Sequence, residues 1–128
     1  MSAGSVSKIE LTLSLKGKGQ LSVELKRHLA PKTTGVIIRA LPLEGNAHMM
    51  GTSMAFMDTA LNTGGEKIRT QFRKGDVGFM ASNGSIWFFL EDSRQTKPMT
   101  LIGKISSNLQ ILSDVKPGDV LSLAQAGT

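Results

Sequence analysis

The segment GDVGFMASNGSIWFFL, residues 75–90, contains the clearest two-stranded pattern in the chain. Asn83 and Gly84 tolerate the positive φ angles of a two-residue type I′ turn, and an apolar run flanks them on each side. The segment therefore predicts a β-hairpin.

Both faces of this hairpin are expected to be apolar. Counting outward from the turn pairs Met80 with Trp87, and successive pairs point to opposite faces. A hairpin with one solvated face would carry polar residues on that face. The two faces instead carry Val77, Phe79, Ala81, Ile86, Phe88 and Leu90 on one side and Gly78, Met80, Trp87 and Phe89 on the other. The hairpin is thus expected to lie between two apolar layers or to line a hydrophobic cavity.

Length and composition predict one domain over residues 1–128. The chain has 128 residues, of which 40% are hydrophobic and 20% charged, as in packed globular proteins. It has no cysteine, which excludes disulfides and zinc-thiolate sites. No apolar run reaches the roughly 20 residues of a membrane-spanning helix, and MSAGSVSK lacks the apolar core of a signal peptide. We expect a cytoplasmic protein with no membrane partner.

The formal charge of +5 could attract anionic partners. However, basic residues occur singly or in pairs, and no stretch interleaves them with aromatic residues as single-strand binding surfaces do. We therefore expect a solvated basic surface and no nucleic-acid partner.

The rest of the chain predicts short strands and one or two short helices. Alternating apolar residues predict strands over 8–15 and 20–26, and Pro31 with helical spacing predicts a helix over 29–41 that Pro42 ends. Before the hairpin, the pattern predicts two strands within 46–58 bent at 51–52, a loop over 59–65 and a strand or extended lead-in over 66–74. After the hairpin, it predicts an exposed polar loop over 91–98 and a strand over 99–105 with a bulge or close approach at Gly103. One or two helical turns capped by Asn108, a type II turn over 116–119 and a strand over 120–123 are expected to follow.

About eight short strands with one or two short helices are typical of a mainly β protein. Closure into a barrel protects the edges of such strands best. The pattern therefore predicts a closed β-barrel rather than alternating βαβ units.

The order of motifs along nearly the whole chain is that of a known family. The motifs are ALPLEG, the methionine-rich strand pair, GDVGFM, IWFF, LIGKI and PGDVLSL. In this order they resemble the small prokaryotic cyclophilin-like proteins, a family catalogued as a domain of unknown function. The resemblance implies a cyclophilin-type β-barrel closed by short helices, and it implies no established activity.

True cyclophilins are peptidyl-prolyl isomerases, so the resemblance raises that activity as an alternative. Phe72-Arg73 and Phe79-Met80 are similar to parts of the cyclophilin signature, which would make Arg73 the candidate catalytic residue. Ala81 and Ser82 follow Met80, however, where the signature has a glutamine. Arg73 also precedes a turn rather than lying inside a clear strand.

The two histidines do not indicate a metal site. His28 follows two basic residues and is expected to be solvated, whereas His48 lies in an apolar strand with a structural or binding role. The carboxylates show no spacing that would complete a metal site with them. No phosphate-binding loop, dinucleotide fingerprint or nucleophile elbow is present. We expect no metal and no cofactor.

The methionines and aromatic residues give the main functional hypothesis. Methionine fills irregular core gaps and also lines adaptable binding surfaces. An apolar concavity with one or two polar anchors is typical of a ligand or peptide site. The candidate binding residues are Met54, Phe56, Phe79, Met80, Trp87, Phe89, His48 and Arg69. We expect a module that binds a small molecule or an extended peptide; the alternatives are prolyl isomerisation and self-association into a homo-oligomer.

Overall fold

Antiparallel strands dominate the computed structural model, which describes residues 8–126. The signal-peptide expectation rests mainly on residues 1–7, which lie outside this range. The elements are β1 (Lys8–Leu15), β2 (Gly19–Lys26), α1 (Pro31–Ala40), β3 (Leu43–Met50), β4 (Met54–Asp58), β5 (Arg69–Phe72), β6 (Asp76–Met80), β7 (Ser85–Phe89), β8 (Ser93–Ser107), η2 (Leu109–Asp114) and β9 (Val120–Gln125).

Eight of these strands close into a barrel, which confirms the predicted fold class. Their order is β2-β1-β9-β3-β4-β7-β6-β8, and β8 pairs back onto β2. At this seam Leu25 lies opposite Gly103. A Cβ atom on Gly103 would come within 2.1 Å of the Glu24 carbonyl oxygen. The predicted close approach at Gly103 is thus confirmed, and the absent side chain lets β2 and β8 meet.

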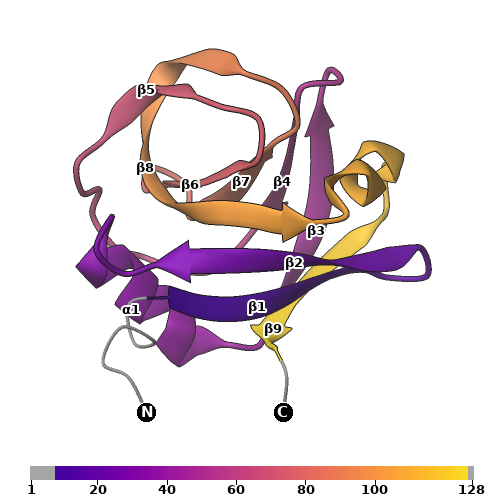
Figure 1. Cartoon of the computed structure of the whole chain (residues 1–128), viewed down its shortest axis with the longest axis horizontal. Helices are drawn as coiled ribbons and strands as arrows, with labels where there is room; N and C mark the ends of the chain where they lie inside the picture. Colours follow the sequence, from indigo (N-terminus) through magenta and orange to yellow (C-terminus); the bar gives the residue numbers. More distant parts are fainter. Residues whose placement is uncertain (1–7, 127–128) are drawn as a thin grey trace.

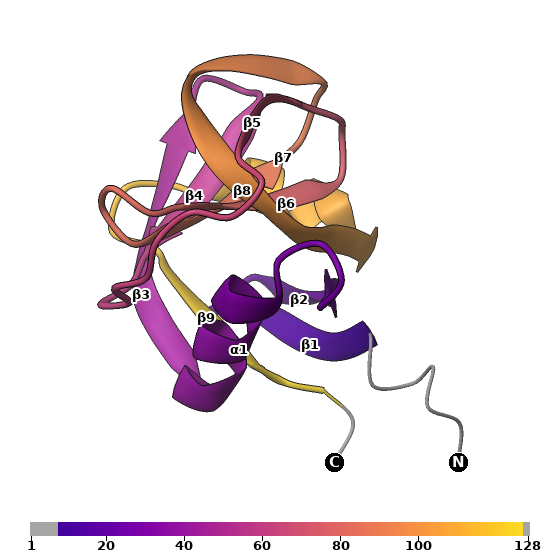
Figure 2. The same cartoon turned by 90° about the vertical axis from the view of Figure 1, so that its left-hand side faces the viewer.

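The barrel interior is filled by the inward-facing residues of its strands. Leu11, Leu13 and Phe79 have no exposed surface there. The helical elements α1 and η2 lie at the left and right of the barrel in Figure 1, and Figure 2 shows α1 in front of the strands. Each helix contributes a fully buried residue to the core, Ile37 from α1 and Leu112 from η2. The short helices therefore cover the two ends of the barrel.

The central hairpin forms with a register different from the prediction. Met80 lies opposite Ser85 rather than Trp87, because four residues connect the strands instead of two. The loop is closed by the Gly84 N–H, which donates to the Met80 carbonyl at 3.0 Å, and Gly84 alone in this loop has a positive φ, of 69°. The type I′ turn at Asn83 and Gly84 was therefore wrong. A shift of two residues keeps every side chain on its predicted face.

The two apolar faces of the hairpin contact two different hydrophobic clusters. The hairpin therefore lies between two apolar layers, which is the first of the two predicted arrangements. The first face joins the barrel core. The second face contributes Met80, Trp87 and Phe89 to a smaller cluster outside the barrel, which we call the outer cluster; its other buried members are Met54, Phe72 and Met99.

A flap covers the outer cluster. We define the flap as β5 together with residues 93–98 of β8, the two segments that curl over the barrel at the top of Figure 1. β5 pairs with β8, placing Phe72 opposite Ser93 and Arg69 opposite Met99. The loop predicted over 91–98 was therefore wrong for residues 93–98, which form a strand, whereas the predicted exposure is confirmed for most of these residues. Its polar residues form a strand with no apolar alternation, because most of its side chains remain exposed.

The predicted helix and the predicted type II turn both form, whereas the predicted N-cap does not. The helix is confirmed over Pro31–Ala40, with Leu41 already extended before Pro42. The type II turn is confirmed by a φ of 92° at Gly118. Asn108 is not a conventional N-cap, because it has a φ of 57° and its side chain makes no capping hydrogen bond. Among residues 8–126, no helix has the length and apolar character needed to cross a membrane.

Candidate functional site

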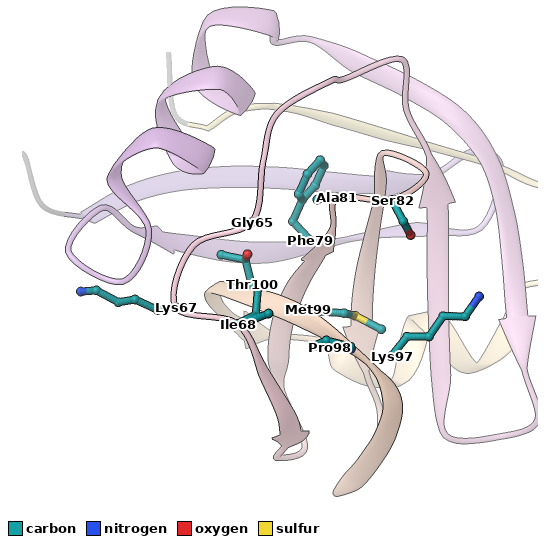
Figure 3. A pocket seen from close by; sticks show the side chains of 10 residues that line it. All are labelled: Gly65, Lys67, Ile68, Phe79, Ala81, Ser82, Lys97, Pro98, Met99 and Thr100. Carbon is teal, nitrogen blue, oxygen red and sulfur yellow. The ribbon is translucent and has the colours of Figure 1, made fainter.

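A hollow of about 490 Å³ lies between the segment leading into β5, the start of the β6–β7 loop and the middle of β8. We call it the apolar hollow, and Figure 3 shows it. The residues that line it are Gly65, Lys67, Ile68, Phe79, Ala81, Ser82, Lys97, Pro98, Met99 and Thr100.

Apolar side chains provide most of the surface of this hollow. Phe79 and Met99 are buried in the two hydrophobic clusters, so their positions are fixed by packing. Ile68 is 57% exposed, more than any other large hydrophobic side chain among the described residues. The hollow therefore combines two fixed apolar residues with an exposed one, which a bound molecule could cover.

Two lysines add positive charge to the apolar hollow. Lys67 and Lys97 extend from opposite sides of it in Figure 3. Neither forms an ion pair within residues 8–126. Lys67 has one long contact, 3.5 Å from its Nζ to the His28 carbonyl oxygen. The ammonium groups of the two lysines point outward at opposite edges of the hollow, so an acidic group at either edge would have one lysine beside it that has no carboxylate partner.

Glu66 fixes one end of the loop that borders the hollow. Its carboxylate accepts hydrogen bonds from the Thr33 backbone N–H at 2.7 Å and from the Thr33 hydroxyl at 2.9 Å. Its own backbone N–H donates to the Thr100 hydroxyl at 2.9 Å. Burial raises the pKa of Glu66, but the hydrogen bonds from Thr33 outweigh it, and the net pKa is lowered. Glu66 thus links α1, the loop and β8.

Thr59 fixes the other end of the same loop. Its backbone N–H donates to the Gly84 carbonyl at 3.0 Å, and its hydroxyl donates to the same oxygen. The Leu61 N–H in turn donates to the Thr59 hydroxyl oxygen at 3.1 Å. A Cβ atom on Gly84 would lie 2.5 Å from the Leu61 carbonyl oxygen. The loop therefore sits directly against the hairpin and is held at both ends.

Most of the predicted binding residues lie away from this hollow. Phe79 lines it, whereas Met54, Met80, Trp87 and Phe89 pack inside the outer cluster. Their role in binding stays a prediction.

His48, Phe56 and Trp87 form a row of stacked rings across β3, β4 and β7. The ring centroids are 4.7 Å apart for His48 and Phe56 and 4.1 Å apart for Phe56 and Trp87. The Trp87 indole N–H donates to the Ser85 hydroxyl oxygen at 2.8 Å. His48 is held by Asp58, with 2.7 Å between Nε2 and Oδ2. Trp87 belongs to the outer cluster and Phe56 packs against it, so the row extends from this cluster to His48.

A second hollow contains the two predicted arginines, Arg69 and Arg73. It has a volume of about 680 Å³ and lies against the flap. We call it the basic hollow, because its charged lining residues are Arg69, Arg73, Arg94, Lys104, Asp76 and Asp92. Phe72 and Leu101 add apolar surface. Arg73 therefore does not lie in the apolar hollow.

Four residues that line the rim of the apolar hollow were not among the predicted binding residues: Lys67, Ile68, Lys97 and Pro98. They lie in two polar stretches without any hydrophobic period. An isolated Ile68 in a polar stretch was the one available signal. Among residues 8–126, no three His, Asp or Glu side chains are grouped closely enough to hold a metal ion.

Comparisons with known proteins agree on the fold. The chain is similar to a hypothetical protein, AF2241, from Archaeoglobus fulgidus, with a TM-score of 0.80, 22% identity, and coverage of 94% of this chain and 96% of the other. It is also similar to McbB, solved in complex with tryptophan, with a TM-score of 0.77 and 13% identity over 92% of this chain. The chain spans 45% of the McbB chain.

At these identities both likenesses concern the fold alone. A comparison with curated proteins found no significant match. The family model described as the cyclophilin-like family matches residues 17–122, which is most of the chain. Together with the closed barrel and its two end helices, this match shows that the chain belongs to the cyclophilin-like family.

Proposed function

We propose that this protein is a binding module whose apolar hollow takes a small molecule with an apolar body and an acidic group. The observation that carries the proposal is the exposed Ile68 beside the buried Phe79 and Met99, all three on one hollow with two unpaired lysines. Ligand sites usually have volumes of roughly 300–1,000 Å³, mostly apolar walls and a few polar groups. The apolar hollow has these properties.

The hollow is also held in shape before any ligand arrives. Glu66 and Thr59 fix the two ends of the bordering loop through hydrogen bonds to α1, β8 and the β6–β7 loop. A preformed site loses less conformational entropy on binding than a mobile one. This favours binding of a defined small molecule over a site that is assembled by its ligand.

L-Tryptophan is a suitable first probe. It combines an aromatic ring, which suits the apolar lining, with a carboxylate, which suits Lys67 at one edge or Lys97 at the other. McbB, which has a similar fold, has been solved in complex with tryptophan. At 13% identity that likeness provides a probe rather than an assignment. Indole-3-propionate, which lacks the amino group, tests whether the acid and the ring suffice.

The test is an NMR titration of the ¹⁵N-labelled protein with each probe. We expect shift changes to concentrate at residues 65–68, 79–82 and 97–100. Lys97→Gln should weaken binding of both acids, and Ala81→Phe should abolish it by filling the hollow. Met50→Ala, at an exposed site away from the hollow, is the matched control and should leave binding unchanged. Saturable shifts confined to the outer cluster, or none with either probe, would overturn the proposal.

An extended peptide is the second ligand class that the hollow could take, and an Ala-Pro peptide tests it in the same titration. The same samples report on prolyl isomerisation, since uncatalysed exchange takes roughly 10–100 s and acceleration is easily seen. Isomerisation has weaker support, because Arg73 lines the basic hollow and its backbone N–H donates to Asp76. Acceleration that is lost in Arg73→Gln would make isomerisation the better proposal.

Self-association has limited support from exposed apolar surface. Met50 and Ile68 are the large apolar side chains with the greatest exposure among the described residues, at 48% and 57%. The outer cluster is covered by the flap and presents no comparable surface. Light scattering across a concentration series tests this alternative: a constant monomer mass would exclude it.

A further inference from the structure

We infer that the basic hollow binds a small phosphorylated molecule that carries at least two negative charges. The inference concerns a site other than the apolar hollow, and it does not depend on the function proposed for that hollow. Four cationic side chains, Arg69, Arg73, Arg94 and Lys104, line the basic hollow. Within residues 8–126, none of the four takes part in an ion pair.

The two carboxylates of the basic hollow are already engaged by backbone groups. Asp76 is buried, and its Oδ2 accepts a hydrogen bond from the Arg73 backbone N–H at 2.9 Å. Asp92 Oδ1 accepts one from the Lys74 backbone N–H at 2.8 Å. These bonds hold the turn between β5 and β6. Four cations against two carboxylates leave a formal charge of +2 facing the hollow, which favours a ligand of at least two negative charges.

The cations surround the hollow from several directions. Arg69 begins β5 and Arg73 follows its end, while Arg94 and Lys104 lie on the two halves of β8. Strand pairing fixes these positions, because Gln71 lies opposite Arg94 and Asp76 lies opposite Lys104. Three of the four cations are guanidinium groups, which bind phosphate oxygens in bidentate fashion better than ammonium groups do.

The size and apolar surface of the hollow indicate an organic part in addition to phosphate. About 680 Å³ is more than a lone phosphate needs. Leu101 and the largely buried Phe72 add apolar surface to the wall of the hollow, and the Phe72 ring is fixed by stacking on Phe89, with centroids 4.5 Å apart and planes inclined by 2°. A phosphomonoester already carries close to two negative charges at neutral pH, so a ligand of this size and charge corresponds to a nucleotide or a sugar phosphate.

Calorimetry on the full chain tests the inference, with inorganic pyrophosphate and adenosine diphosphate as probes. We expect both to bind, and we expect Arg94→Gln and Arg69→Gln each to weaken binding about tenfold through loss of charged hydrogen bonds. Arg39→Gln removes the same charge from α1, where Arg39 is exposed, and should change affinity by less than about twofold. Arg94→Lys should restore part of the loss by returning the charge.

Three results would overturn the inference. The first is absence of binding of both probes to the wild-type chain at millimolar concentration. The second is an equal loss in Arg39→Gln and Arg94→Gln, which would mean general charge attraction without a site. The third is much tighter binding of a short RNA or DNA duplex than of either diphosphate. Circular dichroism and thermal unfolding of Arg94→Gln and Arg69→Gln establish that each variant is folded. Each of the two variants tests the inference on its own.

Failure here is distinguishable from failure of the apolar hollow. Ile68 and Arg69 are neighbours in the chain but line different hollows, as do Thr100 and Leu101. Tryptophan should shift residues 65–68, 79–82 and 97–100, whereas pyrophosphate should shift residues 69–76, 92–94 and 104. Either titration can succeed while the other fails.

Discussion

Phe56 and Trp87 stack across β4 and β7, with ring centroids 4.1 Å apart and ring planes inclined by 12°. Because Phe56 also stacks on His48, it is the middle ring of the row. The ring at this position therefore connects His48 on β3 to the outer cluster beneath the flap.

Replacing this middle ring should destabilise the protein. Phe56→Ala removes two stacking contacts and part of the cover of Trp87, and we expect a loss of about 2–3 kcal/mol in the free energy of unfolding. Urea titration followed by circular dichroism measures it, and Trp87 fluorescence should shift to longer wavelength in the folded state. Met50→Ala on the neighbouring strand should cost less than about 0.5 kcal/mol. Equal losses in the two variants would contradict the structural role of the row.

The barrel seam should be intolerant of a side chain at Gly103. In Gly103→Ala the new methyl group would meet the Glu24 backbone at 2.1 Å, so β2 and β8 would have to separate. We expect a loss of about 3 kcal/mol, at the upper end of overpacking effects. Gly64→Ala is the matched control, because nothing lies within 4 Å of its Cβ position. A Gly103→Ala protein as stable as Gly64→Ala would show that the seam is not closed in this way.

Acidification should remove the contribution of Glu66 to stability. Because the pKa of Glu66 is lowered by folding, the unfolded chain binds more protons through its titration range, and stability contributed by the ionised carboxylate is lost as pH falls through the folded pKa. The stability difference between the wild type and Glu66→Gln should therefore be constant near neutrality and shrink below about pH 4.5.

Thermal unfolding between about pH 6 and pH 2.5 measures this dependence on Glu66. Thr33→Ala removes one of the two hydrogen bonds that stabilise the carboxylate, so the same comparison in a Thr33→Ala background should show a smaller change. A difference between wild type and Glu66→Gln that grows on acidification would have the wrong sign and would refute the assignment.

Removing a hydrogen bond that holds the loop beside the apolar hollow should weaken ligand binding without disturbing the packing of the barrel core. Thr59→Val removes the hydroxyl that bonds to the Gly84 carbonyl and the Leu61 N–H, while its methyl groups preserve the size of the side chain. We expect about threefold weaker binding of indole-3-propionate, since a mobile loop must be ordered on binding. Thr12→Val on β1, away from the loop, serves as the control. Unchanged affinity in Thr59→Val would mean that the loop does not shape the site.

The hairpin illustrates how much of the fold follows from sequence pattern. Alternation of apolar residues assigned Phe79 and Trp87 to opposite faces, and those faces hold although the register was wrong by two residues. Side-chain direction has a period of two, so an even shift is harmless to it. The turn prediction was wrong because Asn-Gly is compatible with hairpin loops of several lengths. In this protein the loop has four residues and is closed by the hydrogen bond from the Gly84 N–H to the Met80 carbonyl.

The hollows could not be predicted in the same way. Ile68 and Lys97 are 29 positions apart, and each lies in a polar stretch whose pairing depends on the bend of β8. Strand formation in the flap is driven by backbone pairing and by burial of Phe72 and Met99, not by a local apolar period. Arg73 was predicted from its resemblance to the cyclophilin signature and Arg69 as a polar anchor of an apolar site. That the two arginines line one hollow depends on the pairing of β5 with β8, which has no local sequence signal.

The long strand β8 pairs with three strands, and the division of these pairings between its two halves has a consequence for local unfolding. Its second half pairs with β6 and β2 inside the closed barrel, whereas residues 93–98 pair with β5 alone. Amide hydrogens of the flap should therefore exchange with solvent through a partial opening that leaves the barrel intact, and those near Ile105 should require global unfolding. An anion bridging Arg94 and Lys104 would join the two halves and slow exchange in the flap alone.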